Sequence, residues 1–203
     1  MQVTKPPGPA AVARRAQIVE AAVETIAELG YGQASFARIA ERAGLSSTRL
    51  ISYHFRGKDE LIARIVAVIH GEIGEFMSAR VRAESTAAGA IRAYITGNVE
   101  FIAANRARMR ALYEIFVNHR PEDGEGAHDA AVDLGVLSHV EEILRWGQRE
   151  GEFRAFEPRV MAMSIQRSVD GLVFLLETGT DVDTSGYASE LATIFDLATR
   201  SRG

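Results

Sequence analysis

One stretch of this chain, RIAERAGLSSTRLISYHFRGKDEL from Arg38 to Leu61, constrains its fold more than any other. Small and apolar residues fall on one face of a short helix, and Gly44 then supplies the backbone freedom with which such a helix ends. Ser46 or Ser47 offers a hydroxyl that accepts a backbone N–H at the start of a second short helix. We therefore expect a helix, a glycine-containing turn and a second helix.

The second helix carries side chains suited to DNA. Leu50 and Ile51 are expected to face inward, while Thr48, Arg49 and Ser52 face outward. Short hydroxyls and a guanidinium are groups that meet phosphates and base edges in the major groove. The pattern therefore favours DNA binding by this helix.

The charge distribution agrees with this interpretation. Residues 1–58 contain eight Lys and Arg against four Glu, a formal charge of +4. Because the whole chain has a net charge of −4, the remaining residues carry a charge of −8. A cationic head on an acidic body is what a DNA reader needs if its second domain must stay away from the phosphates.

Composition excludes several classes of protein. The chain has no cysteine, so disulfides, thiolate zinc sites and cysteine nucleophiles are absent. No apolar run approaches the roughly 20 residues that a membrane helix needs. We therefore expect a soluble, cytoplasmic protein.

Helical periodicity runs through the whole chain and predicts an all-α fold of about nine helices. Residues 1–11 are expected to form a flexible arm, and residues 12–72 a head with three helices and a connecting helix from Lys58 to Phe76. Ser35 is expected to cap the second helix of the head. Residues 119–129 are expected to form a surface loop between helices of a second domain, residues 73–203.

The last two helices of the second domain have more apolar surface than one partner within the chain would cover, which predicts a four-helix interface with a second copy. The residues expected at this homodimer interface are Val169, Leu172, Val173, Leu176, Leu191, Ile194 and Phe195.

At this point the chain from Val12 to Glu72 resembles the amino-terminal domain of the TetR family, bacterial transcription regulators that respond to ligands. The matching pieces are IVEAA from Ile18, LGYG from Leu29, IAERAG from Ile39 and ISYHFRGKDEL from Ile51. They cover roughly a third of the chain.

The resemblance implies a homodimer that places one recognition helix per subunit in successive major grooves of a palindromic operator, usually to repress. Binding of a small-molecule effector would then move the long helix from Lys58 and change the separation of the two heads. The residues implied at the DNA are Ser35, Arg38, Ser46, Ser47, Thr48, Arg49, Ser52, Tyr53, His54 and Lys58.

The motif has one departure from the family pattern, because one extra residue stands between Gly44 and the ISYHF piece. Either the turn is longer by one residue or the helix starts one residue later. The two registers exchange the roles of Ser46, Ser47 and Thr48.

Aromatic, methionine and polar side chains of the second domain could line an effector cavity between helices. They are Tyr94, Asn98, Phe101, Met109, Tyr113, Phe116, Trp146, Gln166 and Asp170. Ordinary core packing is the expected role of most of them, and solvated faces or helix-to-helix hydrogen bonds are favoured for each polar residue taken separately.

Other functions find little support in the sequence. The five histidines show no metal-ligand spacing, and no phosphate loop or nucleophile motif is present, so we expect no metal, no cofactor and no enzyme activity. An all-α binding or scaffold protein without a DNA function is the alternative.

Overall fold

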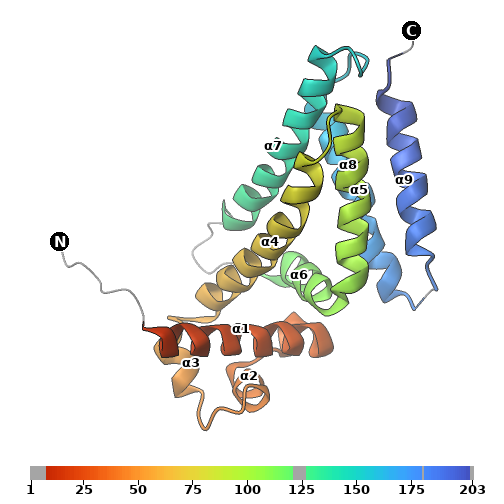
Figure 1. Cartoon of the computed structure of the whole chain (residues 1–203). Coiled ribbons are helices and arrows are strands. Elements are labelled where there is room, and N and C mark those ends of the chain that lie inside the picture. Colours follow the sequence, from red (N-terminus) through yellow and green to blue (C-terminus); the bar gives the residue numbers. More distant parts are fainter. Residues whose placement is uncertain (1–7, 121–126, 180, 202–203) are drawn as a thin grey trace, which may run out of the picture. The chain divides into compact units, whose positions relative to one another are not determined.

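The computed structural model describes residues 8–120, 127–179 and 181–201, and in these ranges the chain forms helices and no strand (Figure 1). The helices are α1 (Pro9–Leu29), the 3-10 helix η1 (Tyr31–Gln33), α2 (Phe36–Arg42), α3 (Arg49–His54), α4 (Lys58–Arg82), α5 (Ala87–Ala104), α6 (Arg106–Asn118), α7 (Ala127–Arg149), α8 (Pro158–Glu177) and α9 (Thr184–Thr199). The predicted all-α class is confirmed for this part of the chain.

The chain divides into two compact units, which are described separately. Unit 1 contains residues 1–69 and 107–125, and unit 2 contains residues 70–106 and 126–203. Unit 1 therefore holds α1 to α3, the first half of α4 and nearly all of α6. The inclusion of α6 differs from the expected division, which assigned that helix to the second domain.

Unit 1 is built on the long helix α1, which packs against α2 and α3. Ile18, Ala22 and Ile26 are buried at helical spacing and form its inner face. The helix ends at Gly30, whose φ of 81° is accessible to glycine at little cost. The Ser35 hydroxyl then accepts the N–H of Arg38 and caps α2, as predicted.

Almost all of α6 belongs to unit 1 and is joined to the head by polar contacts. Arg108 donates to both carboxylate oxygens of Glu20 on α1, at 3.0 and 2.8 Å. The carboxylate of Glu114 accepts the backbone N–H of Tyr31 at 3.0 Å. These contacts connect α6 to the middle of α1 and to η1, which follows it.

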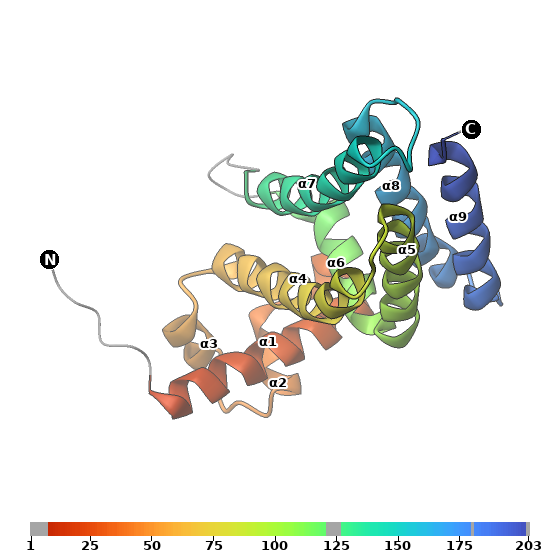
Figure 2. The ribbon, with the colours of Figure 1, turned by 45° about the horizontal axis from the view of Figure 1, so that its top comes forward.

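Unit 2 is organised around α5, which packs against α7, α8 and α9. Figure 2 shows α5 running alongside α9. The carboxylate of Glu152 accepts the N–H groups of Ala87 and Ala88 at the start of α5, both at 3.0 Å. An isolated antiparallel β-bridge between the backbones of Phe153 and Arg200 joins the loop after α7 to the end of α9.

Several predicted boundaries need correction. Helix α1 begins at Pro9 and includes the last residues of the expected arm, because proline is well suited to the first turn of a helix. Helix α4 continues to Arg82, beyond the expected end at Phe76. The rest of the arm, residues 1–7, and residues 121–126 of the expected loop lie outside the described residues.

None of the helices in the described ranges combines the length and the apolar character that a membrane-spanning segment requires.

Candidate nucleic-acid interface

The predicted helix, turn and helix are present. Of the two alternatives for the extra residue, the structure has the longer turn. Helix α2 ends before Gly44, whose φ is 62°. Helix α3 begins at Arg49, and the Ser47 hydroxyl accepts the Arg49 N–H at 3.1 Å. Ser46 and Ser47 therefore lie in the turn, and Thr48 stands at the helix cap.

Helix α3 is held on the head by two buried side chains spaced four residues apart. Ile51 is fully buried and Phe55 is 1% exposed. Leu50 was predicted to face inward as well, and this is wrong, since it is 38% exposed. A helix of six residues has room for one inward stripe, and Ile51 with Phe55 fills it.

The structure describes where each predicted DNA-binding residue lies. Eight of them are exposed on α2, α3 or the turn: Ser35, Arg38, Ser46, Ser47, Thr48, Arg49, Ser52 and Tyr53. His54 and Lys58 are half-buried. Exposure makes the first eight available to a large partner, and their contacts with DNA stay a prediction.

Arg15 on α1 has a structural role that the sequence did not reveal. Its guanidinium donates to the backbone oxygen of His54 and lies 3.1 Å from the Glu60 carboxylate. It also covers the ring of Phe55, 4.2 Å from its centroid. Arg15 therefore joins α1 to the end of α3 and the start of α4, and it positions the outward face of α3.

Lys58 at the start of α4 has its partners within unit 1. Its ammonium donates to the backbone oxygen of Tyr31 at 3.2 Å and lies 3.9 Å from the centroid of the Tyr31 ring. Burial lowers the pKa of Lys58 below its ordinary value. The family resemblance implied a DNA contact for Lys58, and in this structure its ammonium is held by Tyr31.

Tyr31 also connects the head to α6. Its hydroxyl lies 2.8 Å from Nδ1 of His119, which is 6% exposed, and Nε2 of that ring lies 3.8 Å from Asp59. Burial, followed by the charge of Asp59, raises the pKa of Tyr31, so its hydroxyl stays protonated as a donor. The arrangement suits an imidazole that carries its proton on Nε2.

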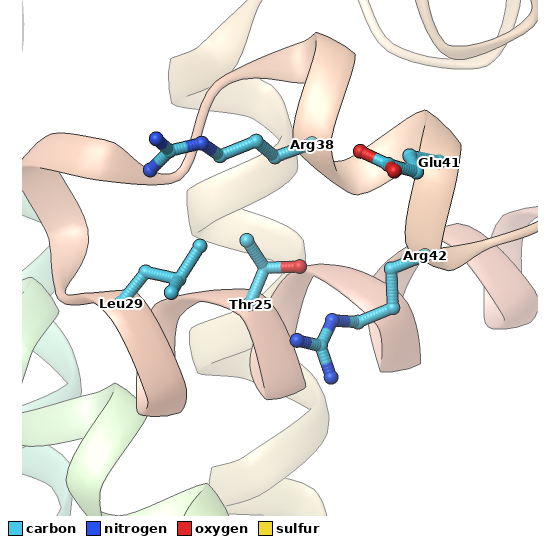
Figure 3. Close-up of a pocket in the computed structure, with 5 residues that line it drawn as sticks. All are labelled: Thr25, Leu29, Arg38, Glu41 and Arg42. Atoms are coloured by element: carbon cyan, nitrogen blue, oxygen red, sulfur yellow. The ribbon is translucent and has the colours of Figure 1, made fainter.

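A surface hollow between α1 and α2 has a volume of about 430 Å³ and is lined by Thr25, Leu29, Arg38, Glu41 and Arg42 (Figure 3). Its charges are of both signs, and Arg42 is engaged by Glu24 and Glu28. The hollow therefore lacks the uniform positive charge that a phosphate site needs.

Four of the nine predicted effector residues form a polar cluster in unit 2. The Tyr94 hydroxyl donates to Gln166, whose amide donates to Asp170 at 2.8 Å, and the Asn98 amide donates to the Tyr94 carbonyl at 2.8 Å. Burial raises the pKa of Tyr94, so its hydroxyl remains a donor.

The other predicted effector residues are dispersed. Phe101 is buried in unit 2 against Phe76, with ring centroids 5.5 Å apart, and Trp146 is half-buried there. Met109, Tyr113 and Phe116 lie on α6 in unit 1. Tyr113 and Phe116 are exposed, contrary to their expected place inside a cavity, because Ala111 and Ile115 occupy the inward face of α6.

The predicted homodimer residues also need correction. Val169, Leu172, Val173 and Phe195 are buried within their own subunit, where α8 packs against α7 and α5, and α9 against α5. Leu176 and Leu191 are half-buried and Ile194 is exposed. The exposed large apolar side chains on these helices are Val160, Met163, Phe174, Leu175, Ile194 and Leu197.

Within the described ranges, no cluster of three or more His, Asp and Glu side chains is arranged to hold a metal ion.

Comparisons of sequence place the chain among known regulators. The model of the family described as bacterial regulatory proteins, tetR family, matches residues 18–65. The chain is 33% identical over 182 residues to the HTH-type transcriptional regulator BetI 1 of Chromohalobacter salexigens, and the match covers 84% of this chain and 83% of that protein.

Solved structures share the fold. AibR, solved in complex with isovaleryl coenzyme A and operator DNA, has a TM-score of 0.76 at 18% identity, over 89% of this chain and 97% of that one. A Saccharomonospora viridis protein solved in complex with choline has a TM-score of 0.81 at 18% identity, over 94% of this chain and 100% of that one.

Proposed function

Because the chain belongs to the TetR family of bacterial regulatory proteins, and is thus a DNA-binding transcription regulator, we propose that it works as a homodimeric repressor. Two copies bind a palindromic operator, and a small-molecule effector that binds unit 2 releases them. The chain then acts in the cytoplasm, where the chromosome lies. The alternative of a scaffold protein without a DNA function is not favoured by this family membership.

The observation that carries the proposal is the outward face of α3. Arg49 and Tyr53 are exposed on it, one helical turn apart, while Ile51 and Phe55 fix the opposite face in the core of unit 1. Arg15 holds the carboxyl end of the helix from α1. A short helix that is rigidly mounted and exposed in this way fits the major groove.

A homodimer is supported by the apolar side chains that α8 and α9 leave exposed. Phe174, Leu175, Ile194 and Leu197 are between 36% and 58% exposed on two helices of unit 2. A second copy that covers them would remove this apolar surface from water. The dimer then presents two α3 helices to half-sites about 34–36 Å apart.

Effector binding is assigned to unit 2 on the strength of the polar cluster around Tyr94. Tyr94 and Asn98 are buried on α5, and the Tyr94 hydroxyl donates to Gln166 on α8, which in turn donates to Asp170. A few polar groups at defined positions among apolar residues are typical of small-molecule sites. Two structural relatives were solved with very different ligands, isovaleryl coenzyme A and choline, so a screen for the effector covers both chemical classes.

The coupling between effector and DNA is proposed to act by population shift. Helix α4 begins in unit 1 with Lys58 and ends in unit 2 with Arg82. An effector that binds one conformer more tightly would favour that conformer, and α4 would carry the change to the head. A change in the separation of the two α3 helices would weaken operator binding.

Operator binding is tested by selecting duplexes from random-sequence DNA with the full-length chain and footprinting the selected sites. We expect a palindromic footprint with half-sites one helical turn apart. Selection without enrichment of any sequence would contradict the proposal. Selection of single, non-repeated sites would contradict the dimer but leave DNA binding intact.

Effector binding is tested by a thermal-shift screen of the full-length chain that includes choline and isovaleryl coenzyme A as probes. A ligand that binds the folded chain raises its melting temperature. Each hit is then added to the complex with the selected operator. Hits that stabilise the chain without releasing DNA would contradict the proposed coupling.

A further inference from the structure

The outward face of α3 contains an apolar side chain that hydrogen bonding to DNA cannot explain. At 100° per residue, Arg49 and Tyr53 lie opposite the buried pair of Ile51 and Phe55, and Leu50 lies at the flank of this outward face, next to Tyr53. Tyr53 is 83% exposed and Leu50 is 38% exposed. Leu50 is therefore a partly exposed side chain beside the recognition face that has no polar group to offer DNA.

Packing within unit 1 leaves part of the Leu50 side chain uncovered. The inward stripe of α3 is complete with Ile51 and Phe55, both of which are almost fully buried. The 38% of Leu50 that stays exposed gains no burial free energy from the fold. Its apolar surface is available to a partner that offers apolar surface in return.

The major groove offers one such group at its floor. The C5 methyl of thymine is the apolar group that distinguishes the major-groove edges of the base pairs, and aliphatic side chains contact it. Leucine has no hydrogen-bonding group, so base discrimination by this side chain has to come from that methyl. Arg49 precedes it in the helix, is exposed on the outward face and has the donors that guanine O6 and N7 accept.

We propose that Leu50 is a specificity-determining residue that reads a thymine methyl in each operator half-site, beside the base contacted by Arg49. This inference rests on the proposed function and deepens it. The operator then has one thymine per half-site whose methyl group, and not its hydrogen-bonding edge, is recognised.

The test replaces each thymine of the selected operator by deoxyuridine, one position at a time, which removes the methyl and keeps the base pairing. We expect one position in each half-site at which the unmodified chain loses about fourfold in affinity, the value of burying one methyl, ~0.8 kcal/mol. Leu50→Ala should bind the thymine operator about as weakly as the unmodified chain binds the deoxyuridine operator, with no further loss on deoxyuridine.

A control variant and a conservative variant keep this test decisive. Val117→Ala truncates a similarly exposed aliphatic residue of unit 1, 44% exposed on α6, and should leave the deoxyuridine pattern unchanged. Leu50→Met keeps an apolar side chain and should retain the methyl sensitivity. Circular dichroism of each variant shows whether it is folded.

Two outcomes would overturn the proposal: the unmodified chain is insensitive to every thymine methyl, or folded Leu50→Ala keeps the full sensitivity. Both differ from failure of the proposed function, in which the unmodified chain selects no specific DNA and binds every duplex with similar affinity. That outcome would remove the basis of the proposal as well.

Discussion

Arg49 is the residue whose loss bears most directly on base recognition. It begins α3, and its side chain is exposed where the helix would enter the groove. If it forms a bidentate contact with a base, Arg49→Ala should weaken specific binding by about 1–3 kcal/mol and relax specificity at one position. A mobility-shift titration against the selected operator and single-base variants measures both effects. Unchanged affinity and footprint would remove Arg49 from the interface.

Glu60 gives a prediction about stability and pH. The N–H of Arg56 donates to its carboxylate at 2.8 Å, and Arg15 lies 3.1 Å away, so both hold the pKa of Glu60 below its ordinary value. The unfolded pKa is about 4.3, and the stabilisation is therefore fully present above that pH and lost as the pH falls through the folded pKa.

Glu60→Gln should accordingly lower the free energy of unfolding by about 0.5–1 kcal/mol at neutral pH, since solvent screens this partly exposed pair. Urea unfolding at a series of pH values should show the difference from the unmodified chain shrinking below about pH 4. A difference that stays constant across the series would mean that the carboxylate charge is unimportant.

At the scale of elements, the attachment of α6 to the head is the feature with the clearest consequence for stability. Tyr31→Phe removes the hydroxyl that pairs with the buried His119 ring at 2.8 Å. An unsatisfied buried polar group costs about 1–3 kcal/mol, and denaturant unfolding should show a loss of this size. Tyr113→Phe removes the hydroxyl of a tyrosine that is 40% exposed on α6 and serves as the control. Equal effects of the two variants would contradict a specific role for the pair.

Elements that depend on local chemistry were predictable from the sequence. Gly44 in the left-handed region and the Ser35 cap mark the ends of α2, and both are visible in the order of the residues. The register of α3 was not predictable, because a longer turn and a later helix start fit the same letters. The contact of Arg15 with Glu60 joins residues 45 positions apart, and no local pattern indicates it.

The apolar helices show a second limit of periodicity. Helix α8 is apolar on more than one face, so spacing alone could not separate its inward face from its exposed one. The stripe of Val169, Leu172 and Val173 turned out to be core. The same ambiguity led to the wrong prediction for Leu50. Leu50 and Ile51 are neighbouring apolar residues, and nothing in the sequence shows which of the two is buried.

At the scale of the whole molecule, the proposed homodimer places the exposed residues of α8 and α9 at its interface. A charge on this surface would be costly to bury, so Leu197→Glu combined with Phe174→Glu should shift the assembly to monomers. Sedimentation over a range of concentrations measures the shift, and Val117→Glu on α6 is the control. A monomer at all concentrations for the unmodified chain would contradict the dimer.

The central claim is that the cationic head binds one DNA sequence through α3. Titration of the selected operator and of a scrambled duplex with the full-length chain, repeated from low to physiological salt, tests it most directly. The account predicts an affinity for the operator at least about a thousandfold above that for the scrambled duplex, and a steep linear fall of log affinity with log salt concentration. Equal affinity for the two duplexes, or binding that does not change with salt, would contradict it.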